Sequence, residues 1–177
     1  IEIITRQSKK KISIKQVENL PNRQKKQVIK DVKLITKIKK FKDLKLNSNP
    51  LIMGILNITP DSFSDGGKYN NYNLAKNQLD NLFNSGADLV DIGGESTRPG
   101  SKTINSKVEW NRIKKILKDI DKKKFISLDT RKSDIMEKGI NLGVKLINDV
   151  SGLSFDKNTK KILKKYKIPF VLQHSLG

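Results

Sequence analysis

The sequence has no cysteine, which excludes disulfide bonds, thiolate metal sites and cysteine nucleophiles. It has one histidine, His174, which we interpret as structural because no Ser–His–Asp or metal-ligand arrangement accompanies it. The GxxxxGKS/T and GxGxxG motifs are both missing, so nucleotide hydrolysis and dinucleotide redox chemistry lose their usual support. No apolar run is long enough to span a membrane, and the first residues do not resemble a signal peptide. Together these absences favour a cytoplasmic protein with no membrane partner.

Acidic and aromatic residues are scarce. The chain has 37 lysine and arginine residues against 18 aspartate and glutamate residues, and its aromatic content is 6%. A nucleic-acid-binding surface usually combines a basic patch with interleaved aromatic side chains. Because lysine dominates here and aromatic residues are few, we interpret the net charge of +19 as solvated helix faces, and we predict no nucleic-acid partner. A basic surface would still attract small anionic substrates.

Residues 1–50 form a basic region with 15 of the basic residues and only four of the acidic ones. Its apolar residues recur every three or four positions, as in an amphipathic helix: Val28, Val32, Ile35 and Ile38. We therefore predict a basic, largely helical N-terminal arm and linker over 1–50, followed by a domain over 51–177. Because the sequence starts at Ile1 and stops just after an apolar run, we expect it to be a fragment of a longer protein.

Five apolar runs follow the arm, and segments with a helical apolar stripe separate them. The runs predict strands over 51–58, 88–94, 125–130, 144–150 and 168–174. Helix caps are expected at Asn73, at the pair Ser106 and Glu109, and at Asp156. Strand alternating with helix indicates an α/β fold with a parallel sheet. This spacing is typical of a (β/α)8 TIM barrel of about 250 residues, so we predict a partial barrel of about the first five βα units.

Polar segments follow the predicted strands, at the sheet edge that holds the active site in α/β proteins. The first is 57-NITPDSFSDGG-67, in which Asp61, Asp65 and the serines supply oxygen atoms and Phe63 supplies a ring. Its glycine pair gives backbone freedom, so this loop can close over an anion and exclude water. The amide oxygen of Asn57 can hold a magnesium ion that also binds phosphate. Alternatively, Asn57 is only a turn residue before Pro60.

The second polar segment is 93-GGESTRPG-100. Arg98 always carries a charge, and its planar guanidinium binds phosphate or carboxylate groups. Thr97 adds a hydroxyl, and Pro99 helps to shape the turn. Alternatively, this is a surface loop in which Arg98 pairs with Glu95; two such loops on neighbouring strands favour the binding function.

Two further polar residues lie at the ends of later strands. Asp129 can accept paired N–H groups from a flat heterocycle, although as a single residue it is equally typical of a helix cap. Asn148 has both a donor and an acceptor, so it can bind a neighbouring edge of the same ring, or it can be a satisfied core amide.

The segments LIMGILNITPDSFSDGG, DIGGESTRPG, SLDTRKSD and LINDVSGL, in this order and spacing, closely resemble the dihydropteroate synthase family. The resemblance implies a (β/α)8 barrel transferase of folate biosynthesis. It would condense 6-hydroxymethyl-7,8-dihydropterin diphosphate with 4-aminobenzoate to give 7,8-dihydropteroate and diphosphate. The resemblance also implies Mg²⁺ as cofactor, inhibition by sulfonamides, and a homodimer in the full-length protein.

The resemblance assigns roles to residues of both loops and both later strands. Asn57 would hold magnesium and diphosphate, and Asp129 and Asn148 would bind the pterin. Asp129 and Arg98 would be the catalytic residues. The remaining substrate-binding residues would lie in the two loops: Asp61, Phe63 and Asp65 in the first, and Thr97, Arg98 and Pro99 in the second.

Gln173 departs from the family pattern, which usually has methionine before the histidine of the fifth strand. The later family motifs lie beyond the sequence, so we expect residues 1–177 alone to be inactive. The alternative is a pterin-binding domain that presents methyltetrahydrofolate to a corrinoid methyltransferase partner. Such a domain binds no diphosphate and has no need of NITPDSFSDGG or STRPG.

Overall fold

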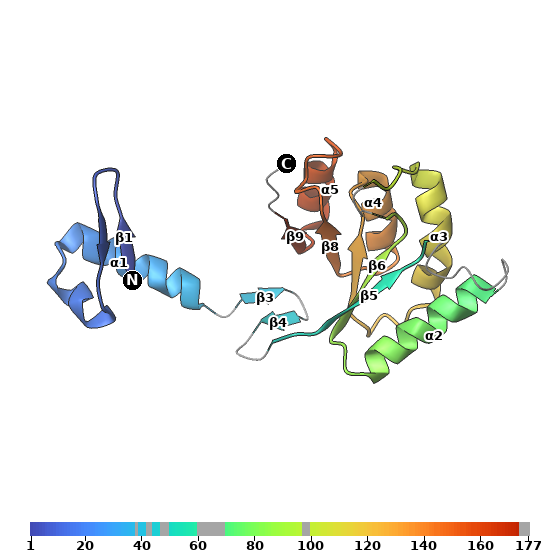
Figure 1. Ribbon diagram of the computed structural model, residues 1–177, viewed down its shortest axis with the longest axis horizontal. Helices are drawn as coiled ribbons and strands as arrows, with labels where there is room; N and C mark the ends of the chain where they lie inside the picture. The colour runs from blue at the N-terminus through green and yellow to red at the C-terminus, as the bar shows by residue number, and fades with distance from the viewer. Residues whose placement is uncertain (38, 42–43, 47–49, 60–69, 97–99, 174–177) are drawn as a thin grey trace. The chain divides into compact units, whose positions relative to one another are not determined.

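The computed structural model describes residues 1–37, 39–41, 44–46, 50–59, 70–96 and 100–173 (Figure 1). Contacts divide the chain into two compact units, Ile1–Lys39 and Lys40–Gly177. We call them the N-terminal unit and the sheet unit. This division falls earlier than the boundary at residue 50 that the composition suggests.

The N-terminal unit combines a hairpin with helices. Strands β1 (Glu2–Ile4) and β2 (Lys9–Lys11) pair antiparallel, and the short 3-10 helix η1 (Ile14–Asn19) and the helix α1 (Asn22–Thr36) follow. The expectation of a largely helical arm therefore omitted the hairpin. Three-residue strands are too short to show a clear apolar alternation in the sequence, which explains the omission.

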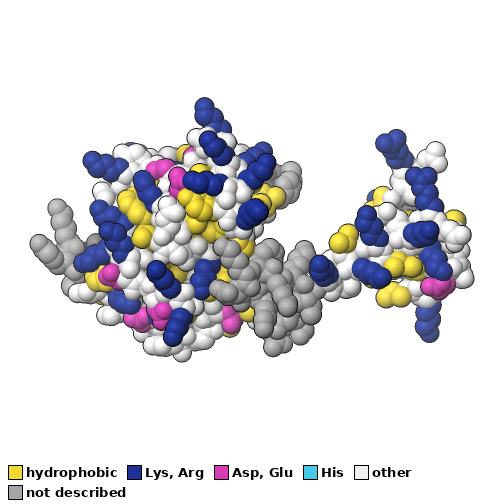
Figure 2. Space-filling model, turned by 180° about the vertical axis from the view of Figure 1, so that it is seen from behind, with side chains coloured by type: hydrophobic (Ala, Val, Ile, Leu, Met, Phe, Trp, Pro, Cys, Tyr) yellow, Lys and Arg dark blue, Asp and Glu magenta, His cyan; other side chains and the backbone are white. Residues whose placement is uncertain are grey.

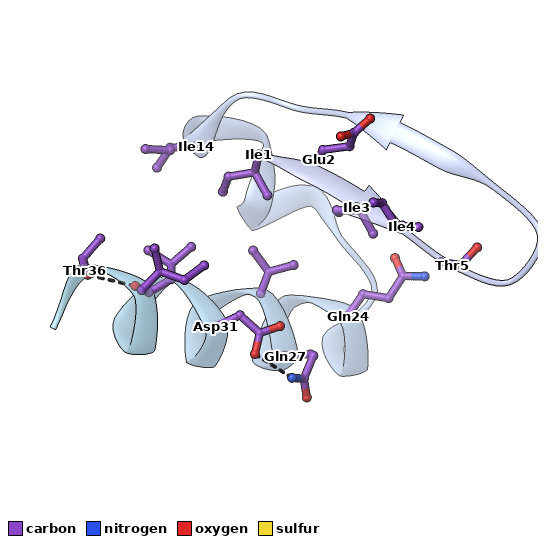
Figure 3. Close-up of a pocket in the computed structure, with 13 residues that line it drawn as sticks. Ile1, Glu2, Ile3, Ile4, Thr5, Ile14, Gln24, Gln27, Asp31 and Thr36 are labelled. Atoms are coloured by element: carbon purple, nitrogen blue, oxygen red, sulfur yellow. Dashed lines mark hydrogen bonds between the residues drawn. The ribbon is translucent and has the colours of Figure 1, made fainter. Parts of the chain in front are cut away.

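The core of the N-terminal unit is small. Its buried residues are Ile12, Val17 and Val28, with Ile3, Leu20 and Val32 packed against them. Beside this core, a groove of about 730 Å³ lies between β1 and α1 (Figure 3). Isoleucines of β1 and η1 line it together with polar side chains of α1 such as Gln24, Gln27 and Asp31.

The sheet unit contains the predicted parallel sheet. Five strands are hydrogen-bonded in chain order: β5 (Met53–Asn57), β6 (Leu89–Gly93), β7 (Ile126–Asp129), β8 (Leu146–Asp149) and β9 (Phe170–Leu172). All neighbouring pairs are parallel, which confirms the five predicted strands and the α/β class. Two short strands, β3 (Lys39–Phe41) and β4 (Leu44–Leu46), form a separate two-stranded sheet.

A helix follows each of the first four strands of this sheet. These helices are α2 (Asn70–Asn84), α3 (Ser106–Asp119), α4 (Ser133–Asn141) and α5 (Thr159–Tyr166). Their expected caps were wrong. Asn73 lies inside α2, and the Asn105 side chain caps α3 by accepting from the Val108 N–H at 2.9 Å. The N-cap of α5 is Asn158, and Asp156 lies two residues before it, where one carboxylate oxygen accepts the Asn158 N–H and the other accepts the Ser133 N–H.

The two faces of the sheet have different chemistry because successive side chains of a strand point to opposite sides. One face packs against the helices through Leu56, Ile92, Leu128 and Ile147. On the other face, Leu89, Phe125 and Leu146 form a small apolar cluster toward the amino ends of the strands. Asn57, Asp129 and Asn148 belong to this second face and lie at the carboxyl ends.

Candidate functional site

Four residues form a row across the carboxyl end of the sheet. In the parallel register, Asn57 pairs with Gly93, Gly93 pairs with Asp129, and Asp129 pairs with Asn148. Cα partners in neighbouring strands point their side chains to the same face. The fold therefore brings together three of the predicted site residues, from three different βα units.

Gly93 lets two side-chain oxygens approach its backbone closely in the middle of this row. A Cβ built on Gly93 would lie 3.3 Å from Asn57 Oδ1 and 3.3 Å from Asp129 Oδ2. The amide oxygen and the carboxylate oxygen therefore approach the glycine from its two neighbouring strands. Any larger residue at position 93 would fill the space between them, so glycine keeps both oxygens accessible to a ligand.

Asp91 orients the Asn148 amide. The Asn148 Nδ2 group donates a hydrogen bond to Asp91 Oδ2 at 2.8 Å, and Asp91 is 5% exposed. Because the amide nitrogen donates to Asp91, the amide oxygen of Asn148 can accept a hydrogen bond from a ligand. In the described part of the chain, Asp129 Oδ1 is buried without a hydrogen-bond partner. Such an orphaned carboxylate oxygen is a ready acceptor for the N–H groups of a bound ring.

The carboxyl groups in and beside the row have raised pKa values. Burial raises the pKa of Asp129 to about 7, and the nearby negative charges add to this shift: Asp91, Glu109, Asp149 and Glu95. Burial also raises the pKa of Asp91, while interactions with Ser127 and with Asn148 oppose that shift. A carboxyl group whose pKa is strongly shifted by burial and by neighbouring charges is typical of a functional site.

Two of the alternatives from the sequence are now resolved. The residue at the N-cap position of α4 is Lys132, so Asp129 does not cap a helix. Asn148 is half-buried and faces Asp91, so it is not an enclosed core amide.

Comparison with known proteins decides the family. The family model described as pterin binding enzyme matches residues 53–177. The chain belongs to the pterin-binding enzyme family. It is 42% identical over 137 residues to a dihydropteroate synthase of Clostridium beijerinckii, a match that covers 76% of this chain and 51% of that relative. The chain thus spans about half the length of the curated relatives it matches.

Solved structures of similar proteins agree. A Xanthomonas albilineans dihydropteroate synthase with 4-aminobenzoic acid gives a TM-score of 0.70 at 37% identity, covering 76% of this chain and 49% of that one. An Anaplasma phagocytophilum dihydropteroate synthase with bound 6-hydroxymethylpterin-monophosphate gives 0.65 at 39% identity, covering 72% and 49%. These matches confirm the partial barrel of the pterin-binding enzyme.

A buried ion cluster lies in the turns that follow β6 and β7 and in α3, and the sequence did not predict it. Lys132 Nζ lies 2.9 Å from Glu95 Oε2 and 2.6 Å from Glu109 Oε2. Glu109 is completely buried, and it was assigned to a helix cap. Its position on the apolar stripe of α3, four residues before Ile113, was the signal that could have revealed its burial.

Glu95 does not depend on Arg98 for a partner. Burial acts to raise the pKa of Glu95, but hydrogen bonds from Lys132, Arg131 and the Ile104 N–H outweigh it and hold the pKa below its ordinary value. These bonds anchor Glu95 within the second polar segment. Ser101, just after that segment, donates a hydrogen bond from its Oγ to the Ser96 carbonyl at 2.6 Å.

The six predicted substrate-binding residues of the two loops lie outside the described part of the chain: Asp61, Phe63, Asp65, Thr97, Arg98 and Pro99. His174 lies outside it as well. Gln173 is described and is exposed just after β9.

The described residues offer a metal ion only a small number of protein oxygens. They contain no group of three or more histidine, cysteine, aspartate or glutamate side chains that could hold a metal. Magnesium usually keeps several waters and binds substrate phosphates, so it needs only one or two protein oxygens. The exposed Asn57 amide at the strand end fits that requirement. In the described part of the chain, no helix is long and apolar enough to cross a membrane.

Proposed function

We propose that this chain forms the N-terminal half of a dihydropteroate synthase. The intact enzyme would join 6-hydroxymethyl-7,8-dihydropterin diphosphate to 4-aminobenzoate and release diphosphate. The observation that carries this proposal is the row of Asn57, Gly93, Asp129 and Asn148 at the carboxyl end of a pterin-binding sheet. Relatives that bind pterin phosphate or 4-aminobenzoic acid share this fold.

The pterin would bind at Asp129 and Asn148. An ionised Asp129 accepts N–H donors of the ring, and its orphaned Oδ1 gives it an acceptor that no described residue uses. Asn148 contributes its oxygen because Asp91 holds its nitrogen. Two acceptors on neighbouring strands therefore meet a ring edge that is rich in N–H donors.

The reaction breaks the bond between the pterin methylene carbon and the diphosphate oxygen, and it forms a bond from the aniline nitrogen to that carbon. The leaving diphosphate takes the bonding electron pair, and the aniline nitrogen later loses a proton to solvent. The departing group leaves positive charge on a carbon that is conjugated to the ring. The Asp129 carboxylate would stabilise this charge from a site with little water.

The diphosphate would lie beside Asn57 and Arg98. Magnesium, when bound, supplies positive charge that improves diphosphate as a leaving group. Asn57 would hold that ion through its amide oxygen, and the guanidinium of Arg98 would pair with the phosphate oxygens.

The first and second loops would complete the aminobenzoate site. Asp61, Phe63 and Asp65 would contribute from the first loop, and Thr97 and Pro99 from the second. Their role is to hold the aniline nitrogen in line with the leaving group. The homodimeric state, the cytoplasmic location and the lack of a nucleic-acid partner belong to the same proposal, and they rest on family resemblance and sequence composition.

The test is an assay of the intact enzyme that contains this chain. Purified protein with both substrates and Mg²⁺ should release diphosphate and form dihydropteroate in equal amounts. Asp129→Asn should reduce kcat/KM by about 10²–10³-fold because the charge that stabilises the transition state is removed. The control is Asp134→Asn, five residues later on α4, where the carboxylate is 45% exposed; it should change kcat/KM less than about twofold.

Dihydropteroate formation that survives Asp129→Asn unchanged would contradict the assigned site. Failure of the wild-type enzyme to consume either substrate would contradict the function itself.

A further inference from the structure

Lys132 is a buried lysine shared by two buried carboxylates. Lys132 is 6% exposed, Glu95 is 4% exposed and Glu109 is completely buried. Lysine and glutamate side chains are almost never fully buried unless they are paired. If one of the three groups moved away, another would therefore be left buried with a charge and fewer partners.

The three groups come from three different elements. Glu95 lies two residues after the end of β6, Lys132 lies three residues after the end of β7, and Glu109 belongs to the first turn of α3. Lys132 Nζ therefore joins the turn after β6 to the turn after β7 and fixes both against α3. The contacts span 37 and 23 positions in the sequence.

Further hydrogen bonds make the same connection. Thr130 Oγ1 donates to Glu109 Oε1 at 2.5 Å, directly after Asp129 in the chain. Arg131 Nε donates to Glu95 Oε2 at 3.2 Å, and Arg112 Nη1 donates to the Gly94 carbonyl at 2.7 Å. Gly94 and Thr130, the residues that follow Gly93 and Asp129, are thus both hydrogen-bonded to side chains of α3.

We propose that Lys132 is a positioning residue for the pterin site: its shared pairing with Glu95 and Glu109 sets the relative placement of Gly93 and Asp129 at the ends of β6 and β7. The inference rests on the proposed function. Lys132 acts through the two turns, whereas Asp129 is the group that meets the substrate. Misplacement of a catalytic group by about 1 Å can cost roughly 10²-fold in rate.

An exposed lysine on α4, the helix that begins directly after Lys132, provides the matched control. Lys138 Nζ lies 3.1 Å from Asp134 Oδ2, and both side chains are nearly half exposed. Exposed pairs of this kind contribute little. Lys138→Met therefore makes the same chemical change as Lys132→Met, but it leaves no buried carboxylate without a partner.

The decisive experiment uses the intact enzyme with three variants, Lys132→Met, Glu109→Gln/Lys132→Met and Lys138→Met. For each variant that folds, we would measure kcat, both KM values and the dissociation constant of the product dihydropteroate. Lys132→Met should lower kcat/KM for the pterin substrate by at least tenfold and weaken product binding by a similar factor. Lys138→Met should change both quantities less than twofold.

The double variant distinguishes positioning from simple stability. The double variant removes the charges of Glu109 and Lys132 together. Glu95, the remaining carboxylate of the cluster, keeps its pairing with Arg131. The double variant should therefore recover at least fivefold of the lost kcat/KM. Should Lys132→Met fail to fold, the double variant compared with the wild type decides the question. In that comparison, a loss of at least twofold in kcat/KM with unchanged fold supports positioning, and no loss overturns it.

The pH profile gives a readout that a merely structural role would not change. Four acidic groups of the surrounding elements act electrostatically on Asp129: Asp91 on β6, Glu95 after it, Glu109 on α3 and Asp149 on β8. Removing Lys132 leaves the charges of Glu95 and Glu109 less compensated, so the midpoint of the pH–rate profile should rise, and the double variant should restore it. Wild-type kinetics and midpoint in folded Lys132→Met would overturn the inference, whereas an inactive wild type would refute the proposed function instead.

Discussion

The N-terminal unit and the sheet unit use the same lysine-rich composition in different ways. Figure 2 shows lysine and arginine side chains distributed over both units. All nine buried polar or charged side chains among the described residues nevertheless belong to the sheet unit. In the described part of the N-terminal unit, the buried residues are apolar and few. The difference teaches that burial of charge, and not the amount of charge, marks the candidate site in this protein.

The two units also differ in how their cores are built. The core of the sheet unit extends across four strands, β5 to β8, and four helices, from Leu56 on β5 to Leu163 on α5. The core of the N-terminal unit contains three buried residues. A larger contiguous core can hold groups such as Lys132 and Glu109 away from water at a fixed geometry, which a small core cannot.

Among the substitutions that compare the two units, the largest effect is expected at Gly93, in the middle of the row of the sheet unit. Gly93→Ala should lower kcat/KM by about 10–100-fold, because the new Cβ would lie 3.3 Å from oxygens of Asn57 and Asp129. Gly54→Ala is the control, since its Cβ would meet Leu82 on the helix side at 3.1 Å. The control should lower stability and leave both KM values unchanged. Equal KM values for Gly93→Ala and the wild type would contradict the assigned row.

The next prediction tests whether the two cores are independent. Trp110, the single tryptophan of the chain, packs against the sheet-unit core, so its fluorescence reports the unfolding of that unit. Val90→Ala should lower the free energy of unfolding of the intact protein by about 2–3 kcal/mol, because Val90 is completely buried. Val17→Ala in the N-terminal unit should leave the urea midpoint of Trp110 fluorescence unchanged. A shift of similar size in both variants would mean that the units unfold together.

A rise in pH should increase the activity of the enzyme and decrease its stability. With a pKa of about 7, Asp129 becomes ionised between about pH 6 and 8, so kcat/KM should rise roughly tenfold over that range. The folded-state pKa lies above the ordinary value of 3.8, so the folded state binds more protons than the unfolded state. The contribution of the Asp129 carboxyl to folding stability is therefore at its maximum below about pH 4, and it is lost as the pH rises to about 7.

Thermal unfolding of the intact protein at several pH values checks this stability term. Asp129→Asn should remove the part of the decline that occurs below about pH 7, because asparagine does not titrate. A decline that is identical in this variant and in the wild type would assign it to other groups.

The smallest effect is expected from the N-terminal unit. Deletion of residues 1–39 from the intact enzyme should change kcat/KM less than about twofold, because no described residue of that unit belongs to the row or to the ion cluster. The measurement is steady-state kinetics with both substrates. A loss of tenfold or more would show that the N-terminal unit contributes to the site.

Residues 1–177 by themselves should show no synthase activity. The sheet ends at β5 and β9, where Ile55 is 65% exposed and Leu172 is 62% exposed. Exposed apolar strands of this kind favour aggregation. An active, monomeric preparation of residues 1–177 would refute this prediction.

Much of the sheet unit could be predicted from the sequence, because hydrophobic periodicity reports local backbone geometry. The apolar runs at 51–58 and 125–130 became β5 and β7. Helix starts were less predictable, since several polar residues near each start compete for the cap. Asn105 rather than Ser106 caps α3, and the Ser106 hydroxyl donates to Asp134 instead.

By itself, the sequence determined the alternation of strands and helices, the family motifs, and the placement of Asn57, Asp129 and Asn148 at strand ends. The tertiary structure alone decided that Gly93 separates two of these side chains, that Asp91 orients Asn148 from 57 positions away, and that Lys132 joins Glu95 to Glu109. The physical reason is that periodicity depends on hydrogen bonds between near neighbours in the chain. The pairing of distant side chains depends on strand register and helix packing, which exist only after the chain has folded.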